Sequence, residues 1–88
     1  MKFNVPDHVL EERIGDEVVL LSLKRETFFS LNASGIVLWT GMKAGRSAEE
    51  LAGELANQYG LEIVRAVADV QSFVDELQKL ELITPVSG

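Results

Sequence analysis

The sequence contains no cysteine, a single histidine and no apolar run longer than four residues. Without cysteine, the protein has no disulfide bond, no thiolate nucleophile and no thiolate metal site. Runs of this length are far shorter than the roughly 20 residues that a transmembrane helix needs. Residues 1–7 also lack the apolar stretch and the small-residue cleavage site of a secretory signal. We therefore expect a cytoplasmic protein that does not associate with membranes.

Positive charge is also scarce. Lys and Arg together number 8 and Asp and Glu together 14, which gives a net charge of −6. The basic residues are scattered along the chain, and the longest cluster is the pair Lys24–Arg25. A net negative charge repels the phosphates of nucleic acids and of anionic lipid surfaces. The composition therefore argues against a nucleic-acid partner.

No group of residues forms a recognisable catalytic or metal-binding motif. His8 precedes the first predicted strand without a second imidazole to complete a metal set, so we expect an exposed loop histidine. The serines lack a nucleophile-elbow pattern. Catalytic acids and bases need a buried carboxylate with a shifted pKa, whereas Glu49, Glu50, Glu54 and the pair Asp75–Glu76 fall on predicted water-facing helix surfaces. The glycines form neither a phosphate loop nor a dinucleotide fingerprint. We therefore expect no enzyme activity, no metal and no cofactor.

The overall composition is that of an ordinary soluble domain, with 47% hydrophobic and 25% charged residues. A chain of 88 residues is long enough for one hydrophobic core and too short for two. We therefore predict a single domain over residues 1–88, with its core between about residues 9 and 83.

Alternating and β-branched residues predict three strands, at 9–14, 17–23 and 27–31. A Gly-Asp turn separates the first two, and short connections favour antiparallel neighbours. In the third strand, Phe29 and Leu31 share one face, whereas Phe28 and Ser30 share the other. We therefore expect a three-stranded antiparallel meander.

The period of the apolar residues changes after the third strand. Asn32 is a favoured helix N-cap, and the apolar residues that follow predict a helix over residues 33–43. Trp39 lies on the inner stripe of this helix, where an indole is most often a core anchor. Gly45 suits the left-handed residue that follows a helix C-terminus.

Two more helices complete the predicted fold. Ser47–Glu50 has the pattern of a capping box for a second helix that ends at Gly60. From about Ile63, apolar residues recur every three or four positions and predict a third helix. After this helix, Pro85 and Gly88 mark a frayed tail. The order βββααα predicts an α+β fold.

Five segments of the sequence have a characteristic order and spacing: Val18–Leu23, Thr27–Asn32, Gly35–Trp39, Asp69–Leu77 and Leu82–Ile83. They correspond to a hairpin strand, an aromatic strand ending in Leu-Asn, a helix with Gly and Trp, an Asp-Val-x-x-Phe helix and an apolar end. In this order they resemble the PqqD-like family, whose members are also called precursor-peptide recognition elements. The resemblance covers about residues 9 to 83.

This resemblance implies a winged-helix-like domain that acts as a peptide chaperone and not as an enzyme. In that family, the leader of a ribosomally made precursor peptide adds as a strand beside the third strand and lies against the third helix. The short, aromatic third strand at a sheet edge supports such a site independently. The implied leader-binding residues are Thr27, Phe28, Phe29, Ser30, Val67, Val70, Gln71, Val74 and Gln78.

The chosen flank of the third helix places Val74 at the rim of the cleft and Phe73 and Leu77 toward the core. Because this cleft would have an apolar centre and few charges, we expect leader affinity to vary weakly with salt.

The resemblance also implies partner enzymes, such as a leader peptidase, a cyclase or another peptide-modifying enzyme. Members that serve pyrroloquinoline quinone synthesis look like Leu-Leu-Pro-Glu-Gly before the third strand, whereas this sequence has Leu21-Ser-Leu-Lys-Arg25. Phe28, Phe29 and Trp39 are more similar to the stand-alone recognition proteins of lasso-peptide clusters. A chaperone for pyrroloquinoline quinone synthesis and a winged-helix DNA-binding protein remain alternatives, and a homodimer through the open strand edge is also compatible with the sequence.

Overall fold

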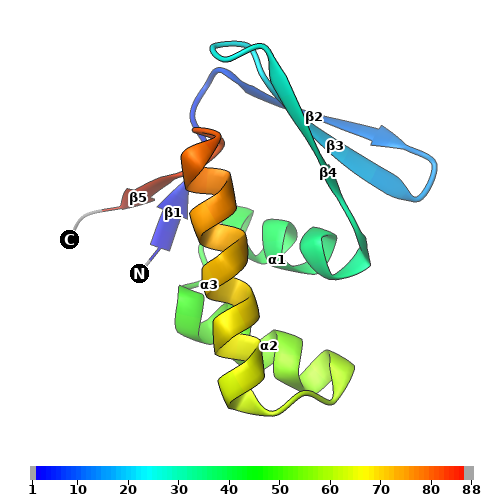
Figure 1. Ribbon diagram of the computed structural model, residues 1–88, viewed down its shortest axis with the longest axis vertical. Coiled ribbons are helices and arrows are strands. Elements are labelled where there is room, and N and C mark those ends of the chain that lie inside the picture. Colours follow the sequence, from blue (N-terminus) through cyan, green and yellow to red (C-terminus); the bar gives the residue numbers. More distant parts are fainter. Residues whose placement is uncertain (1, 87–88) are drawn as a thin grey trace.

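The computed structural model describes residues 2–86 (Figure 1). Its elements are β1 (Lys2–Asn4), β2 (Val9–Ile14), β3 (Glu17–Ser22), β4 (Thr27–Leu31), α1 (Ala33–Lys43), α2 (Ala48–Tyr59), α3 (Ile63–Lys79) and β5 (Thr84–Val86). The predicted α+β fold, a three-stranded antiparallel sheet followed by three helices, is confirmed. No helix within residues 2–86 has the length and apolar character needed to span a membrane.

The three-stranded sheet has the strand order β2-β3-β4 and is antiparallel throughout. Its register pairs Leu20 with Phe29 and Val18 with Leu31, and these side chains share the inner face. Val18, Leu20 and Leu31 are buried in the core, and Phe29 packs against it. The predicted division of the third strand into two faces is therefore confirmed.

The predicted helix boundaries are confirmed by their capping interactions. Asn32 Oδ1 accepts a backbone N–H at 2.8 Å at the start of α1. Ser47 and Glu50 form the complete capping box of α2, with hydrogen bonds of 2.9 and 3.2 Å. Gly45 and Gly60 have φ angles of +86° and +64° after α1 and α2, a conformation that costs glycine little.

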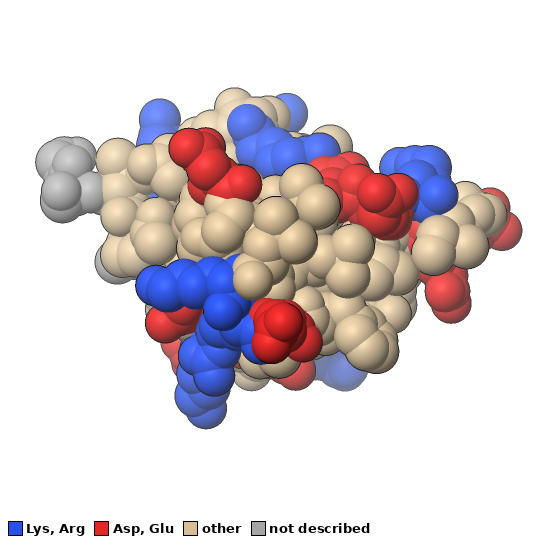
Figure 2. Space-filling view, turned by 90° about the horizontal axis from the view of Figure 1, so that it is seen from above, with Lys and Arg blue, Asp and Glu red and all other residues tan. Residues whose placement is uncertain are grey.

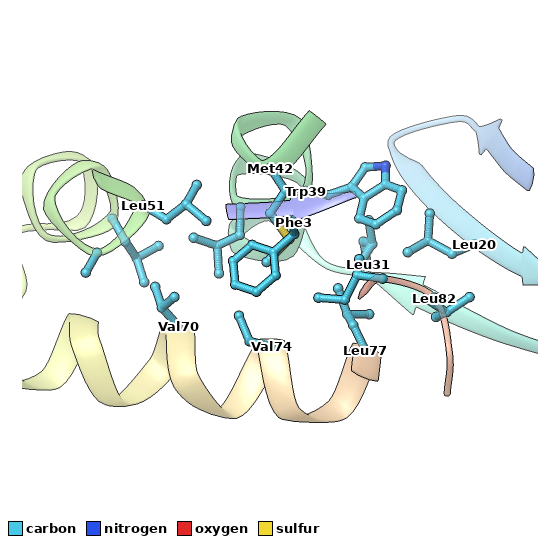
Figure 3. Packing of buried hydrophobic residues seen from close by; sticks show 14 of the residues in the cluster. Phe3, Leu20, Leu31, Trp39, Met42, Leu51, Val70, Val74, Leu77 and Leu82 are labelled. Carbon is cyan, nitrogen blue, oxygen red and sulfur yellow. The ribbon is translucent and has the colours of Figure 1, made fainter. Parts of the chain in front are cut away.

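The core is organised around one stripe of α3, which consists of Ala66, Val70, Val74 and Leu77. Figure 3 shows Val70 pointing toward Leu51 of α2, Val74 toward Phe3 of β1 and Leu77 toward Leu31 of β4. The stripe therefore joins the helices and the N-terminal segment in one apolar cluster.

Trp39 is buried, as predicted, and its indole N–H has a hydrogen-bond partner. Its Nε1 donates to Glu11 Oε1 at 2.7 Å, and Lys43 Nζ donates to the same oxygen at 2.6 Å. These bonds tie β2 to α1. They also favour the charged carboxylate, so that Lys43 first and Trp39 second lower the pKa of Glu11 below its usual value.

The prediction of a frayed tail is wrong at residues 84–86. Thr84–Val86 form β5, which pairs with β1 and places Pro85 opposite Phe3. Phe3 is only 6% exposed, and the burial of its ring stabilises a two-stranded pairing that is too short to persist alone. The core thus reaches the segment before residue 9. Gly88, also assigned to the tail, lies outside the described residues.

We predict that Glu11→Gln lowers the free energy of unfolding at pH 7 by about 0.5–1 kcal/mol, because a neutral amide replaces the carboxylate that accepts both hydrogen bonds. The lowered pKa means that the stabilisation by ionised Glu11 is present above its usual pKa and is lost as the pH falls through the lowered value. Urea unfolding should therefore show a difference at pH 7 that shrinks as the pH is lowered into the acidic range where Glu11 takes up a proton. Glu12→Gln, on the other face of β2, is the control. A difference that is independent of pH would contradict this account.

Candidate functional site

A cleft with a volume of ≈ 630 Å³ lies between β4 and α3, within the usual size range of ligand sites. One wall consists of the end of β4 and the start of α1, residues 29–35. The facing wall is one flank of α3, formed by Asp69, Ser72, Phe73 and Glu76. Tyr59, at the end of α2, is also part of the lining. The cleft is thus bounded by segments from all three helices and the sheet.

An aromatic contact joins the two walls. The rings of Phe29 and Phe73 meet edge to face, with 6.5 Å between their centroids and 62° between their planes. Such pairs contribute roughly 0.5–1.5 kcal/mol beyond the area that they bury. This contact sets the separation of β4 and α3 at the apolar centre of the cleft.

The C-terminal end of α3 is held by loops that flank the sheet. Arg25 Nη1 donates to the Lys79 carbonyl at 2.9 Å, and Lys24 Nζ lies 3.3 Å from the Glu81 carboxylate. His8 Nε2 donates to the Glu81 carbonyl at 2.9 Å. The prediction of an exposed loop histidine is therefore wrong, because His8 is half-buried and helps to fix α3 beside the sheet.

The edge of β4 that faces away from β3 has no strand partner among residues 2–86. An unpaired edge presents free N–H and C=O groups from alternate residues. Phe29 and Ser30, two of the predicted site residues, border the cleft. Phe28 is 70% exposed on the outer face of the sheet, and half-buried Thr27 lies beyond the cleft lining.

The predicted flank of α3 does not face this cleft. Val70 and Val74 are 2% and 3% exposed and lie in the core, so the placement of Val74 at a cleft rim is wrong. Val67, Gln71 and Gln78 lie on the opposite side of the buried stripe, away from the cleft lining. Successive residues of a helix are rotated by roughly 100° about its axis. If the buried stripe of α3 is centred one residue away from its true position, the flank predicted to face the cleft is therefore the wrong one.

Two of the α3 cleft residues that were not predicted belong to a motif that the sequence analysis had identified. Asp69 and Phe73 are the two fixed ends of the Asp-Val-x-x-Phe pattern that contributed to the family resemblance. Phe73, expected in the core, is half-buried and lines the cleft. Its spacing from Asp69 was the signal that could have identified this flank.

The rim of the cleft is acidic. Its lining includes the carboxylates of Asp69 and Glu76 and contains no Lys or Arg. Arg65 lies 3.8 Å from Asp69, in an exposed pair that screens this charge only weakly. Figure 2, which views the molecule from above, shows basic and acidic groups interspersed with uncharged surface on that face.

The chain belongs to the PqqD family, because residues 17–83 match the family described as Coenzyme PQQ synthesis protein D (PqqD). Two solved structures are similar over almost their whole length. TbiB1 in complex with the TbiA(beta) leader peptide has a TM-score of 0.86 and 31% identity, with 100% of each chain covered. Lasso peptide synthetase B1 complexed with the leader peptide has a TM-score of 0.88 and 20% identity, with 97% of this chain and 100% of that chain covered. No curated protein gave a match.

We predict opposite outcomes for two substitutions on α3. Val74→Glu should cost several kcal/mol and unfold most of the protein, because it buries an unpaired carboxylate in the core. Val67→Glu should change the free energy of unfolding by less than about 0.5 kcal/mol, because Val67 is 51% exposed. Thermal melting followed by circular dichroism compares the two variants. A Val74→Glu variant that melts like the unmodified protein would show that the buried stripe is misassigned.

Proposed function

We propose that this protein is a non-catalytic chaperone that binds the leader of a ribosomally made precursor peptide. The leader adds to the sheet as a strand beside β4 and occupies the cleft between β4 and α3. In this account the protein works in the cytoplasm and delivers the bound precursor to a modifying enzyme, such as a leader peptidase or a cyclase.

The observation that carries this proposal is the unpaired edge of β4 beside a preformed cleft. The strand Thr27–Leu31 carries no charged residue, although charges are a common protection of exposed sheet edges. An extended peptide can satisfy the free backbone groups of β4 with its own main chain. Side chains that point to the inner face then reach the cleft, where Phe29 and Phe73 offer aromatic surface.

The acidic rim of the cleft changes the salt dependence that we expect for leader binding. Asp69 and Glu76 make the rim negative, so a leader that places a basic side chain against this rim gains affinity that salt reduces. The apolar centre is unaffected by salt. The leader affinity should therefore have a salt-sensitive part in addition to the apolar part expected from the sequence.

A lasso-peptide pathway is the subgroup that the observations favour. TbiB1, which is 31% identical over its whole length, was solved with the TbiA(beta) leader peptide. The departure from the Leu-Leu-Pro-Glu-Gly pattern at Leu21–Arg25 argues against a role in pyrroloquinoline quinone synthesis. A homodimer through β4 would compete with the leader for the same edge.

We predict that Ser72→Trp weakens leader binding at least roughly tenfold, because the indole occupies the cleft that the leader needs. Ser72 is exposed on the cleft flank, so the fold should persist. Gln71→Trp, also exposed but on the other flank, is the matched control and should bind normally. The measurement is isothermal calorimetry with the cognate leader peptide and with a scrambled peptide of the same composition.

Three outcomes would contradict the proposal in different ways. Normal binding by Ser72→Trp together with loss of binding by Gln71→Trp would assign the site to the opposite flank of α3. Equal affinity for the scrambled peptide would exclude specific leader recognition. Binding of duplex DNA at low salt, with no binding of the leader, would support the winged-helix alternative.

A further inference from the structure

An apolar row crosses the outer face of the three-stranded sheet. The register pairs Leu10 of β2 with Leu21 of β3, and Leu21 with Phe28 of β4. Directly paired residues of antiparallel strands project from the same face. Leu10 is 43% exposed, Leu21 is half-buried and Phe28 is 70% exposed. Of the two edge strands, β2 and β4, the row is therefore more exposed at β4.

Phe28 has a cross-strand neighbour on one side only. Leu21 is its paired residue on β3, and β4 has no partner on its other side among the described residues. The next pair of this face, Val19 with Ser30, is smaller and leaves the ring of Phe28 as the main apolar feature of the edge. A strand added to β4 would bring one side chain next to this ring.

We propose that Phe28 is a specificity-determining residue that selects an apolar side chain at the leader position beside it on the outer face. This inference depends on the proposed leader-binding function. Because strand residues alternate between faces, the two neighbours of that leader position point inward to the cleft. The leader is thus recognised on both faces of the extended sheet, by the cleft inside and by Phe28 outside.

Cross-strand pairing supplies the physical reason. Paired side chains lie with their Cβ atoms roughly 4.5–5.5 Å apart, and aromatic–aliphatic pairs stabilise a sheet relative to small or polar pairs. An apolar leader side chain would complete the row and cover the free side of the Phe28 ring. A charged side chain there would lose this contact and leave the ring exposed.

The test replaces each residue of the leader in turn by Thr and measures the affinity of every peptide for the unmodified protein and for Phe28→Thr. Threonine suits an exposed strand position, so this variant should fold. At one outward leader position, the substitution by Thr should lower the affinity for the unmodified protein roughly fivefold. The same peptide should bind Phe28→Thr with almost the affinity of the unsubstituted leader. Val67→Thr, at another exposed apolar residue, is the control and should give the profile of the unmodified protein.

If Phe28→Thr and the unmodified protein have the same affinity for every peptide, the inference about Phe28 is wrong, although leader binding itself is intact. The same holds if the variant only abolishes self-association, measured by sedimentation, because Phe28 would then serve a contact between two copies of the chain. Failure of the unmodified protein to bind the unsubstituted leader would instead refute the proposed function itself.

Discussion

The packing of α3 through Ala66, Val70, Val74 and Leu77 is the constraint on which the rest of the structure depends. Because this stripe is fixed against α1, α2 and β1, the neighbouring flank of α3 has to face β4. The Phe29–Phe73 contact and the hydrogen bond from Arg25 to the Lys79 carbonyl then hold the helix beside the sheet. A cleft remains between β4 and α3, next to a strand edge that has no partner among residues 2–86. A preformed site of this kind lowers the ordering cost of binding a flexible peptide.

Much of the fold could be predicted because its signals are local. The Asn32 cap, the capping box at Ser47 and the glycine at position 60 define helix ends through contacts within a few residues. The pairing of β1 with β5 could not be predicted in the same way, because it joins residues at opposite ends of the sequence. Its stability comes from the burial of Phe3, and the sequence around this residue gives no indication of its partner.

The site was predictable as far as the strand and the helix that form it, but the flank of the helix was not. Phe73 and Val74 are adjacent apolar residues, and either one continues an apolar stripe at helical spacing. Only the positions of the other elements decide that Val74 is buried while Phe73 faces β4. His8 illustrates the same limit, because its hydrogen-bond acceptor, Glu81, is distant in the sequence. The flank of α3 and the burial of His8 were both predicted wrongly because contacts between residues distant in the sequence decide them.

Strand addition requires hydrogen bonds from the backbone of the bound peptide at alternate residues. In an added strand, only alternate N–H groups point toward β4, whereas the remaining ones point to solvent. The most direct measurement is the affinity of leader peptides that carry a single N-methyl group at successive positions, determined by calorimetry. Strand addition beside β4 predicts that every second methylated position loses about tenfold or more in affinity and that the positions between them bind nearly normally. A profile without this alternation would contradict the account.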